Sequence, residues 1–193
     1  MTEGLPLFPL ATVLFPGGKL ELRIFEPRYL SMVSRCLTQQ SPFGVVAIKQ
    51  GSEVGAAETF AVGTLAEIVD WRQEPDGLLG LTVNGRGTFV VERVQRAADG
   101  LYVGQVRPNE AAAAAPLAPQ HAPLAALLRK LLERRGAERP SPVAYDDAHW
   151  VGSRLAELLP LPVAERQSLL ETADADTRLA ALTTLLATPP ERG

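Results

Sequence analysis

The stretch LFPGGKLELRIFEPRYL, from Leu14 to Leu30, decides how the first half of the chain folds. Its Gly18-Lys19 pair has a superficial likeness to a phosphate-binding loop, which reads G-x-x-x-x-G-K-[ST] because several backbone amides must converge on the anion. Val13 stands where the first glycine belongs, and Leu20 stands where the hydroxyl residue belongs. The Pro16-Gly17-Gly18 run therefore predicts a turn and not a nucleotide site.

After this turn the sequence changes period. Leu20, Leu22 and Ile24 alternate with charged residues, which is the period-two pattern of a half-buried strand. Pro27 then suits the first turn of a short helix. The residues that we expect to share one face of that helix are Leu30, Val33 and Leu37.

Composition is that of an ordinary folded protein. Of 193 residues, 46% are hydrophobic and 21% are charged, which allows a sizeable core. The net charge of -3, the pI near 5.5 and the scattered basic residues do not match a nucleic-acid binder. The single cysteine, Cys36, allows no internal disulfide, and two histidines, His121 and His149, supply no zinc cluster. We expect no metal and no other cofactor.

The N-terminal residues and the apolar runs bear on location. An acid, Glu3, stands in place of a basic segment, and prolines interrupt the apolar residues after it, so no secretory signal is predicted. No apolar run approaches the roughly 20 residues that span a bilayer. These features predict a cytoplasmic protein without a membrane partner.

Residues 5–107 indicate short strands separated by turns. Beyond the strand at Leu20, we expect strands at 43–48, 60–69, 78–83, 88–94 and 101–106. Asn84-Gly85 predicts a tight hairpin because both residues accept a positive φ, and Asp76-Gly77 and Asp99-Gly100 are similar turn signals. Many short strands with close turns predict a closed or nearly closed β-barrel.

A change in composition marks a domain boundary. The segment NEAAAAAPLAPQHAP has no periodic apolar pattern, so we interpret residues 109–122 as a connection between a barrel at 1–108 and a helical bundle at 123–193. The predicted fold class is α+β.

The bundle is expected to hold about four helices with recognisable ends. The end signals are Gly136 after the helix from Leu124, Asp146 or Asp147 as an N-cap, Pro162 at a helix start, and Asp174 or Asp176 as a further N-cap.

No constellation of residues predicts catalysis. A Ser-Lys nucleophile needs a desolvated lysine, whereas Lys19, Lys49 and Lys130 all lie in contexts typical of solvated charges. Cys36 lies on the inner side of a predicted helix and is expected to be a buried apolar residue. His121 and His149 are expected at the surface.

One aromatic feature indicates a surface for a partner. Trp71 and Leu78-Leu79 flank RQEPDG, so a hairpin tip would present apolar side chains to another protein. The alternative, favoured by the usual burial of tryptophan, is that these residues close one end of the barrel.

The order of four segments resembles a known family. LPLFPLATVLFPGGKLELRIFEPRYLSMV, FAVGTLAEIVDW, GLTVNGRGTFVVERV and LAELLPLPVAERQSLLETADADTRLAALTTLL together resemble the N-terminal substrate-binding domain of Lon proteases, which also occurs in free-standing bacterial proteins and in cereblon. The resemblance implies a PUA-like pseudo-barrel with a short helix, followed by a helical bundle. The strands and helices expected above agree with it.

The resemblance also implies a function. Full Lon enzymes continue into an ATPase module and a Ser-Lys protease, while the resemblance here ends with the recognition domain. It therefore implies a non-enzymatic protein that binds unfolded or apolar polypeptide segments, through an apolar groove or by strand addition, as an adaptor for a protease or chaperone. The candidate binding residues are Arg28, Tyr29, Trp71, Leu78 and Leu79.

Alternatives stay open at this point. Glu26 and Arg28 lie at a helix start, so the competing interpretation is that they fix this corner of the fold. PUA-like barrels can hold RNA, although the scattered arginines argue against it. A small hydrolase with a pocket between barrel and bundle is the third hypothesis. The oligomeric state is not predicted.

Overall fold

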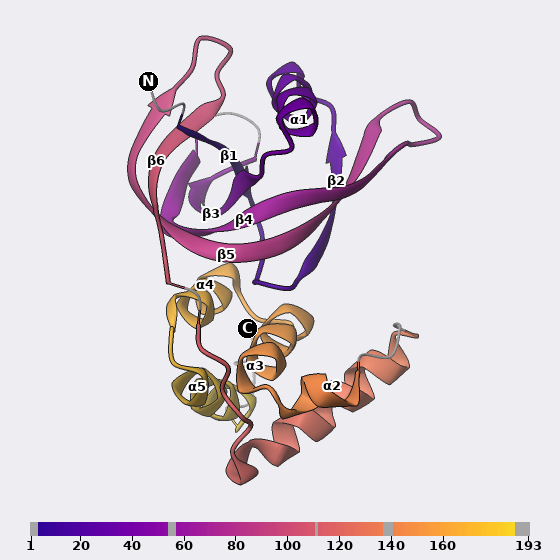
Figure 1. Cartoon of the computed structure of the whole chain (residues 1–193), viewed down its shortest axis with the longest axis vertical. Coiled ribbons are helices and arrows are strands. Elements are labelled where there is room, and N and C mark those ends of the chain that lie inside the picture. The colour runs from indigo at the N-terminus through magenta and orange to yellow at the C-terminus, as the bar shows by residue number, and fades with distance from the viewer. Residues whose placement is uncertain (1–3, 54–56, 111, 137–140, 188–193) are drawn as a thin grey trace. The chain divides into compact units, whose positions relative to one another are not determined.

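The structure is a computed structural model that describes residues 4–53, 57–110, 112–136 and 141–187 (Figure 1). The chain forms two compact units, Met1–Ala111 and Ala112–Gly193. In the described residues, the first unit holds six strands and one α-helix, and the second holds four α-helices and two short 3-10 helices. The predicted α+β class is confirmed. No helix in the described ranges combines the length and apolar character needed to cross a bilayer.

The strands of the first unit form one sheet that closes on itself. Their bounds are β1 Leu5–Leu10, β2 Lys19–Ile24, β3 Phe43–Gly51, β4 Ala57–Gln73, β5 Leu79–Arg96 and β6 Tyr102–Pro108. The order along the sheet is β2-β5-β4-β3-β1-β6, and a further pairing of β5 with β6 joins five of the strands into a ring (Figure 1). β2 lies outside the ring as the end strand. This arrangement is the predicted pseudo-barrel.

β5 is the strand that holds this sheet together. One edge of β5 pairs with β4 from Leu79 to Val90. Its other edge has two partners in succession, because β2 pairs with residues 79–84 and β6 pairs with residues 89–96. The change of partner falls in the middle of β5.

The predicted hairpin at Asn84-Gly85 is wrong, because β5 runs through both residues without a turn. Gly85 instead allows two segments of backbone to approach each other closely. The turn before β2 crosses β5 here: the Gly17 amide donates to the Gly85 carbonyl and the Gly85 amide donates to the Gly18 carbonyl, each at 2.8 Å. A Cβ on Gly85 would lie 2.2 Å from the carbonyl oxygen of Phe15. The strands expected at 78–83 and 88–94 are therefore one strand.

The other two turn signals are confirmed. Gly77 and Gly100 both have φ near +85°, a region that favours glycine. The Gly77 amide donates to Glu74 and the Gly100 amide donates to Ala97, each at 2.9 Å, so each glycine closes the turn between two antiparallel strands.

β1 contains two prolines and is not among the strands predicted one by one. Pro6 precedes the pairing of β1 with β3, which begins at Leu7, and Pro9 follows the pairing of β1 with β6, which ends at Leu7. Each proline thus lies where β1 is paired along one edge only, and there a missing N–H breaks no ladder.

Helix α1, Pro27–Gln39, packs its buried face on the strands of the first unit. Pro27 occupies the first turn as predicted, and Val33 and Cys36 are buried as predicted. The prediction for Leu30 and Leu37 is wrong, since both side chains are exposed. The side chains of Tyr29, Met32, Val33 and Cys36 point inward. Leu30 and Leu37 lie outside this buried face of the helix.

The second unit contains the four α-helices that the sequence predicts. Their bounds are α2 Ala122–Arg134, α3 Ala148–Leu158, α4 Val163–Glu171 and α5 Ala175–Ala187. Asp147 caps α3 by accepting hydrogen bonds from the amides of His149 and Trp150, at 2.9 and 3.3 Å. Asp174 accepts from the Thr177 amide at 2.8 Å, and Gly136 follows α2 with φ +61°. The predicted caps are thus confirmed by their geometry.

Two buried polar side chains join the helices of the second unit. The Arg178 guanidinium donates to the carbonyls of Leu169 and Thr172, which fixes α5 against α4. The surface position predicted for His121 is wrong: its side chain is buried, and its Nε2 lies 2.7 Å from Oδ1 of Asp176. No local pattern predicts this pair, because its members lie far apart along the chain.

The crossing at Gly85 yields a stability prediction. We expect Gly85→Ala to lower the free energy of unfolding by about 2 kcal/mol, because the new methyl group would meet rigid backbone. Gly87→Ala is the matched control on the same strand, since nothing lies within 4 Å of a Cβ there. Urea denaturation measures both variants, and equal losses of stability would contradict the assigned role of Gly85.

Candidate functional site

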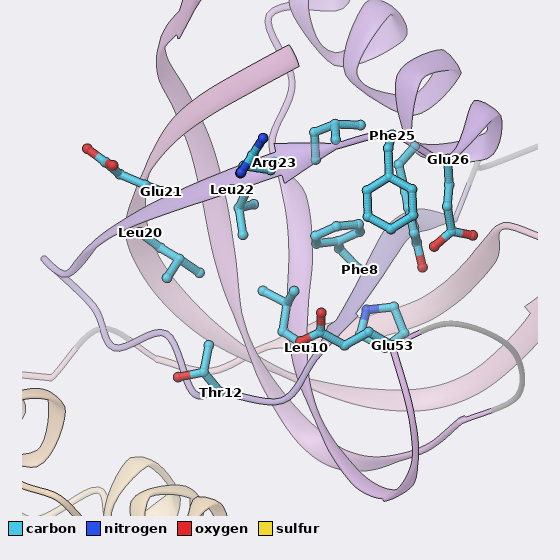
Figure 2. A pocket seen from close by; sticks show the side chains of 13 residues that line it. Phe8, Leu10, Thr12, Leu20, Glu21, Leu22, Arg23, Phe25, Glu26 and Glu53 are labelled. Carbon is cyan, nitrogen blue, oxygen red and sulfur yellow. The ribbon is translucent and has the colours of Figure 1, made fainter. Parts of the chain in front are cut away.

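A groove of about 360 Å³ lies in the first unit, between the second half of β1 and the free edge of β2. Figure 2 shows Leu20 and Leu22 of β2 turned toward Phe8 and Leu10 of β1, with Phe25 and Glu26 at one end. Glu21 and Arg23 point away from this apolar interior.

The strand pairing explains why a groove forms at this place. β6 pairs with β1 only over residues 5–7, so residues 8–10 of β1 have no strand on that side within the described sheet. β2 is the end strand, and its pairing with β5 occupies one of its edges. Two strand segments with unpaired edges therefore border one hollow.

The groove wall is apolar and well supported. The Phe8 ring packs edge-to-face on Tyr29, with 4.1 Å between ring centroids, and on Phe43, with 6.1 Å. Such contacts hold the ring in one orientation. Phe25 differs from the other apolar lining residues because 57% of it is exposed, so it offers apolar surface at the mouth of the groove.

Two carboxylates flank the groove near Tyr29. Glu26 forms an ion pair with Arg28, with Oε2 2.8 Å from Nη2. Glu53 accepts a hydrogen bond from the Ala11 amide at 2.7 Å, and the ion pairs between described residues include no cation for it. Arg23 is the one basic residue among the described residues of the lining, and it is paired with Asp76 of the β4–β5 turn. The groove therefore carries an excess of negative charge.

Tyr29 contributes a buried hydroxyl to this region. The residue is 4% exposed, and its hydroxyl oxygen has no hydrogen-bond partner among the residues that the structure describes. Burial raises the pKa of Tyr29 to about 12, Arg28 opposes this shift, and the negative charges of Glu26 and Glu53 add to it.

Arg28 fixes the corner where β2 leads into α1. Besides its ion pair with Glu26, it donates to the carbonyl of Gly100 at 3.1 Å and lies over the Tyr29 ring, 4.7 Å from the centroid. These contacts favour the interpretation that Glu26 and Arg28 are fold-fixing residues. Of the predicted binding residues, only Tyr29 lines the groove.

The predicted hairpin surface lies elsewhere on the first unit. Trp71 is 60% exposed, so the expectation that it closes the barrel by burial is wrong, while Leu78 and Leu79 are half-buried. Trp71 pairs with Leu81 on β5 and lies near an edge of the sheet that the neighbouring strands do not cover.

The sequence interpretation missed most residues of the groove. Phe8, Leu10 and Glu53 come from separate segments, and only the closed sheet brings them to β2. The alternation of Leu20, Leu22 and Ile24 was the available signal in the sequence. It identified the apolar face of β2 but not the segments that face it across the groove.

Two kinds of group with catalytic potential, metal ligands and the cysteine thiol, can be assessed in the described ranges. No three residues among the described histidines, cysteines, aspartates and glutamates are placed to hold a metal ion. Burial raises the pKa of the Cys36 thiol, which disfavours the reactive thiolate.

A hollow bounded by free strand edges is a geometry that can hold an extended polypeptide segment. The family model for the substrate-binding domain of ATP-dependent protease La (LON) matches residues 4–188, and the chain belongs to this family. It is 27% identical over 191 residues to Lon protease 2 of Myxococcus xanthus, an alignment that covers 94% of this chain and 23% of that protein. It is 33% identical over 110 residues to protein cereblon of Danio rerio, covering 54% of this chain and 25% of that protein.

Solved structures agree with this assignment. The Lon N-terminal domain protein from Xanthomonas campestris is 41% identical, with a TM-score of 0.78 over 96% of this chain and 99% of that one. The N-terminal domain of the Mycobacterium avium complex Lon protease is 16% identical, with a TM-score of 0.66 over 94% of this chain and 97% of that one, and shows the shared fold alone. The chain spans about a quarter of the length of the two relatives named above.

The Tyr29 hydroxyl, which has no hydrogen-bond partner within the described part of the chain, yields a second prediction. We expect Tyr29→Phe to raise the free energy of unfolding by about 1 kcal/mol at neutral pH, because a buried hydroxyl without a partner loses its hydration. The gain should grow above pH 10, because the wild-type residue ionises in the unfolded chain while the folded state keeps its proton up to about pH 12.

Tyr102→Phe is the matched control, since the Tyr102 hydroxyl accepts from the Ala57 amide at 3.3 Å and its removal should destabilise the fold. Urea denaturation at neutral and alkaline pH measures both variants. A loss of stability in Tyr29→Phe at neutral pH would show that the hydroxyl has a partner.

Proposed function

We propose that this chain is a polypeptide-binding module that holds apolar or unfolded segments in the groove between β1 and β2 and catalyses no reaction on them. The observation that carries the proposal is an apolar groove beside free strand edges, in a chain of the Lon substrate-binding family. Binding of this kind would serve an adaptor that presents polypeptides to a protease or chaperone in the cytoplasm.

Magnitudes favour weak, reversible capture. Burying one leucine or phenylalanine side chain contributes about 1.5–3 kcal/mol, and ordering an unfolded ligand opposes part of that gain. A groove of about 360 Å³ admits only a few side chains, so affinity per site should lie in the micromolar range. Such affinity suits a protein that must release its ligand.

RNA is not proposed as the ligand. Glu26 and Glu53 flank the groove, and Arg23 is already paired with Asp76, so phosphate groups would meet repulsion. The Trp71 hairpin with Leu78 and Leu79 is kept as the competing surface for a polypeptide, because its exposed indole offers apolar contact.

One binding experiment separates the two surfaces. Fluorescence anisotropy with labelled unfolded casein should show saturable binding, and Phe25→Ala should weaken it about tenfold by removing apolar surface at the groove mouth. Trp71→Ala is the matched control, because it removes an equally exposed aromatic ring outside the groove. If Trp71→Ala lost binding and Phe25→Ala kept it, the binding site would lie at the hairpin. Absence of binding by the wild-type protein at high micromolar concentration would contradict the proposed function.

A further inference from the structure

The free edge of β2 and the negative charge of the groove together specify the ligand further than the apolar surface of the groove does. β2 pairs with β5 through one edge only. Its apolar residues, Leu20, Leu22 and Ile24, line the groove. An edge of this kind offers main-chain donors and acceptors to an incoming strand. The hollow beside it accepts the side chains of that strand.

Charge narrows the choice of ligand. Glu53 is exposed, accepts one backbone hydrogen bond, and has no cationic partner among the described ion pairs. The second carboxylate, Glu26, is already bound to Arg28. A basic side chain on the ligand would therefore find Glu53 available, whereas an acidic one would meet the uncompensated negative charge of Glu53.

We propose that the groove selects an extended polypeptide segment that adds to the free edge of β2, places apolar side chains against Phe8 and Leu10, and directs a lysine or arginine to Glu53. This inference rests on the proposed function and specifies its ligand. It predicts recognition of main chain and charge together, so that a purely apolar or acidic segment binds less well.

Peptides about nine residues long, labelled with fluorescein, test the charge requirement by anisotropy. In one peptide leucine alternates with lysine, in the second with glutamate, and in the third with serine. We expect the lysine peptide to bind about tenfold more tightly than the glutamate peptide, and this preference should shrink as salt is raised.

Glu53→Gln tests the residue, because glutamine keeps an acceptor for the Ala11 amide and removes the charge. It should reduce the lysine preference about threefold and leave the serine peptide unaffected. Glu133→Gln, an exposed change of equal charge on α2, is the matched control and should alter neither affinity. Equal affinity for the lysine and glutamate peptides, or an unchanged preference in Glu53→Gln, would overturn the charge selection.

Backbone methylation tests strand addition. N-methylation of alternate residues of the lysine peptide blocks one edge of it, so one register should bind about tenfold more weakly and the other register should bind as before. Equal binding of both methylated registers would overturn strand addition while binding of the unmethylated peptides still supported the proposed function. Failure of all three unmethylated peptides and of unfolded casein to bind would contradict the proposed function itself.

Discussion

The division of one edge of β5 between two partners is the constraint on which the first unit depends. β6 takes the second half of that edge and closes the ring, so β2 can occupy only the first half and remains an end strand. The change of partner requires the turn before β2 to cross β5 at Gly85, where no side chain fits. The same division that closes the barrel thus leaves a groove beside β2.

An exposed edge strand invites unwanted association, and the two faces of β2 differ in character. Its outward residues, Lys19, Glu21 and Arg23, are charged. These charges discourage pairing of β2 with an apolar strand of another molecule. Its inward residues are apolar and border the hollow. Under the proposal, a partner would have to match both faces of the strand, and this requirement would give a groove of modest affinity its specificity.

Local rules predicted the features that depend on neighbours in the sequence. Asp147 and Asp174 cap helices, and Gly77 closes a turn, because each acts on residues within three positions of itself. Asn84-Gly85 carries an equally strong local signal, but the crossing backbone at Phe15 decides its conformation. The groove could not be predicted, because Glu53 and the strands beside it meet only after the ring closes.

The central claim is that ligand binds along the free edge of β2, and amide hydrogen exchange measures it most directly. Exchange of the backbone amides is compared in the free protein and in the protein saturated with the leucine-lysine peptide. The account predicts added protection in residues 19–24 of β2, at the amides that do not pair with β5. Added protection confined to the hairpin around Trp71, or to the second unit, would contradict it.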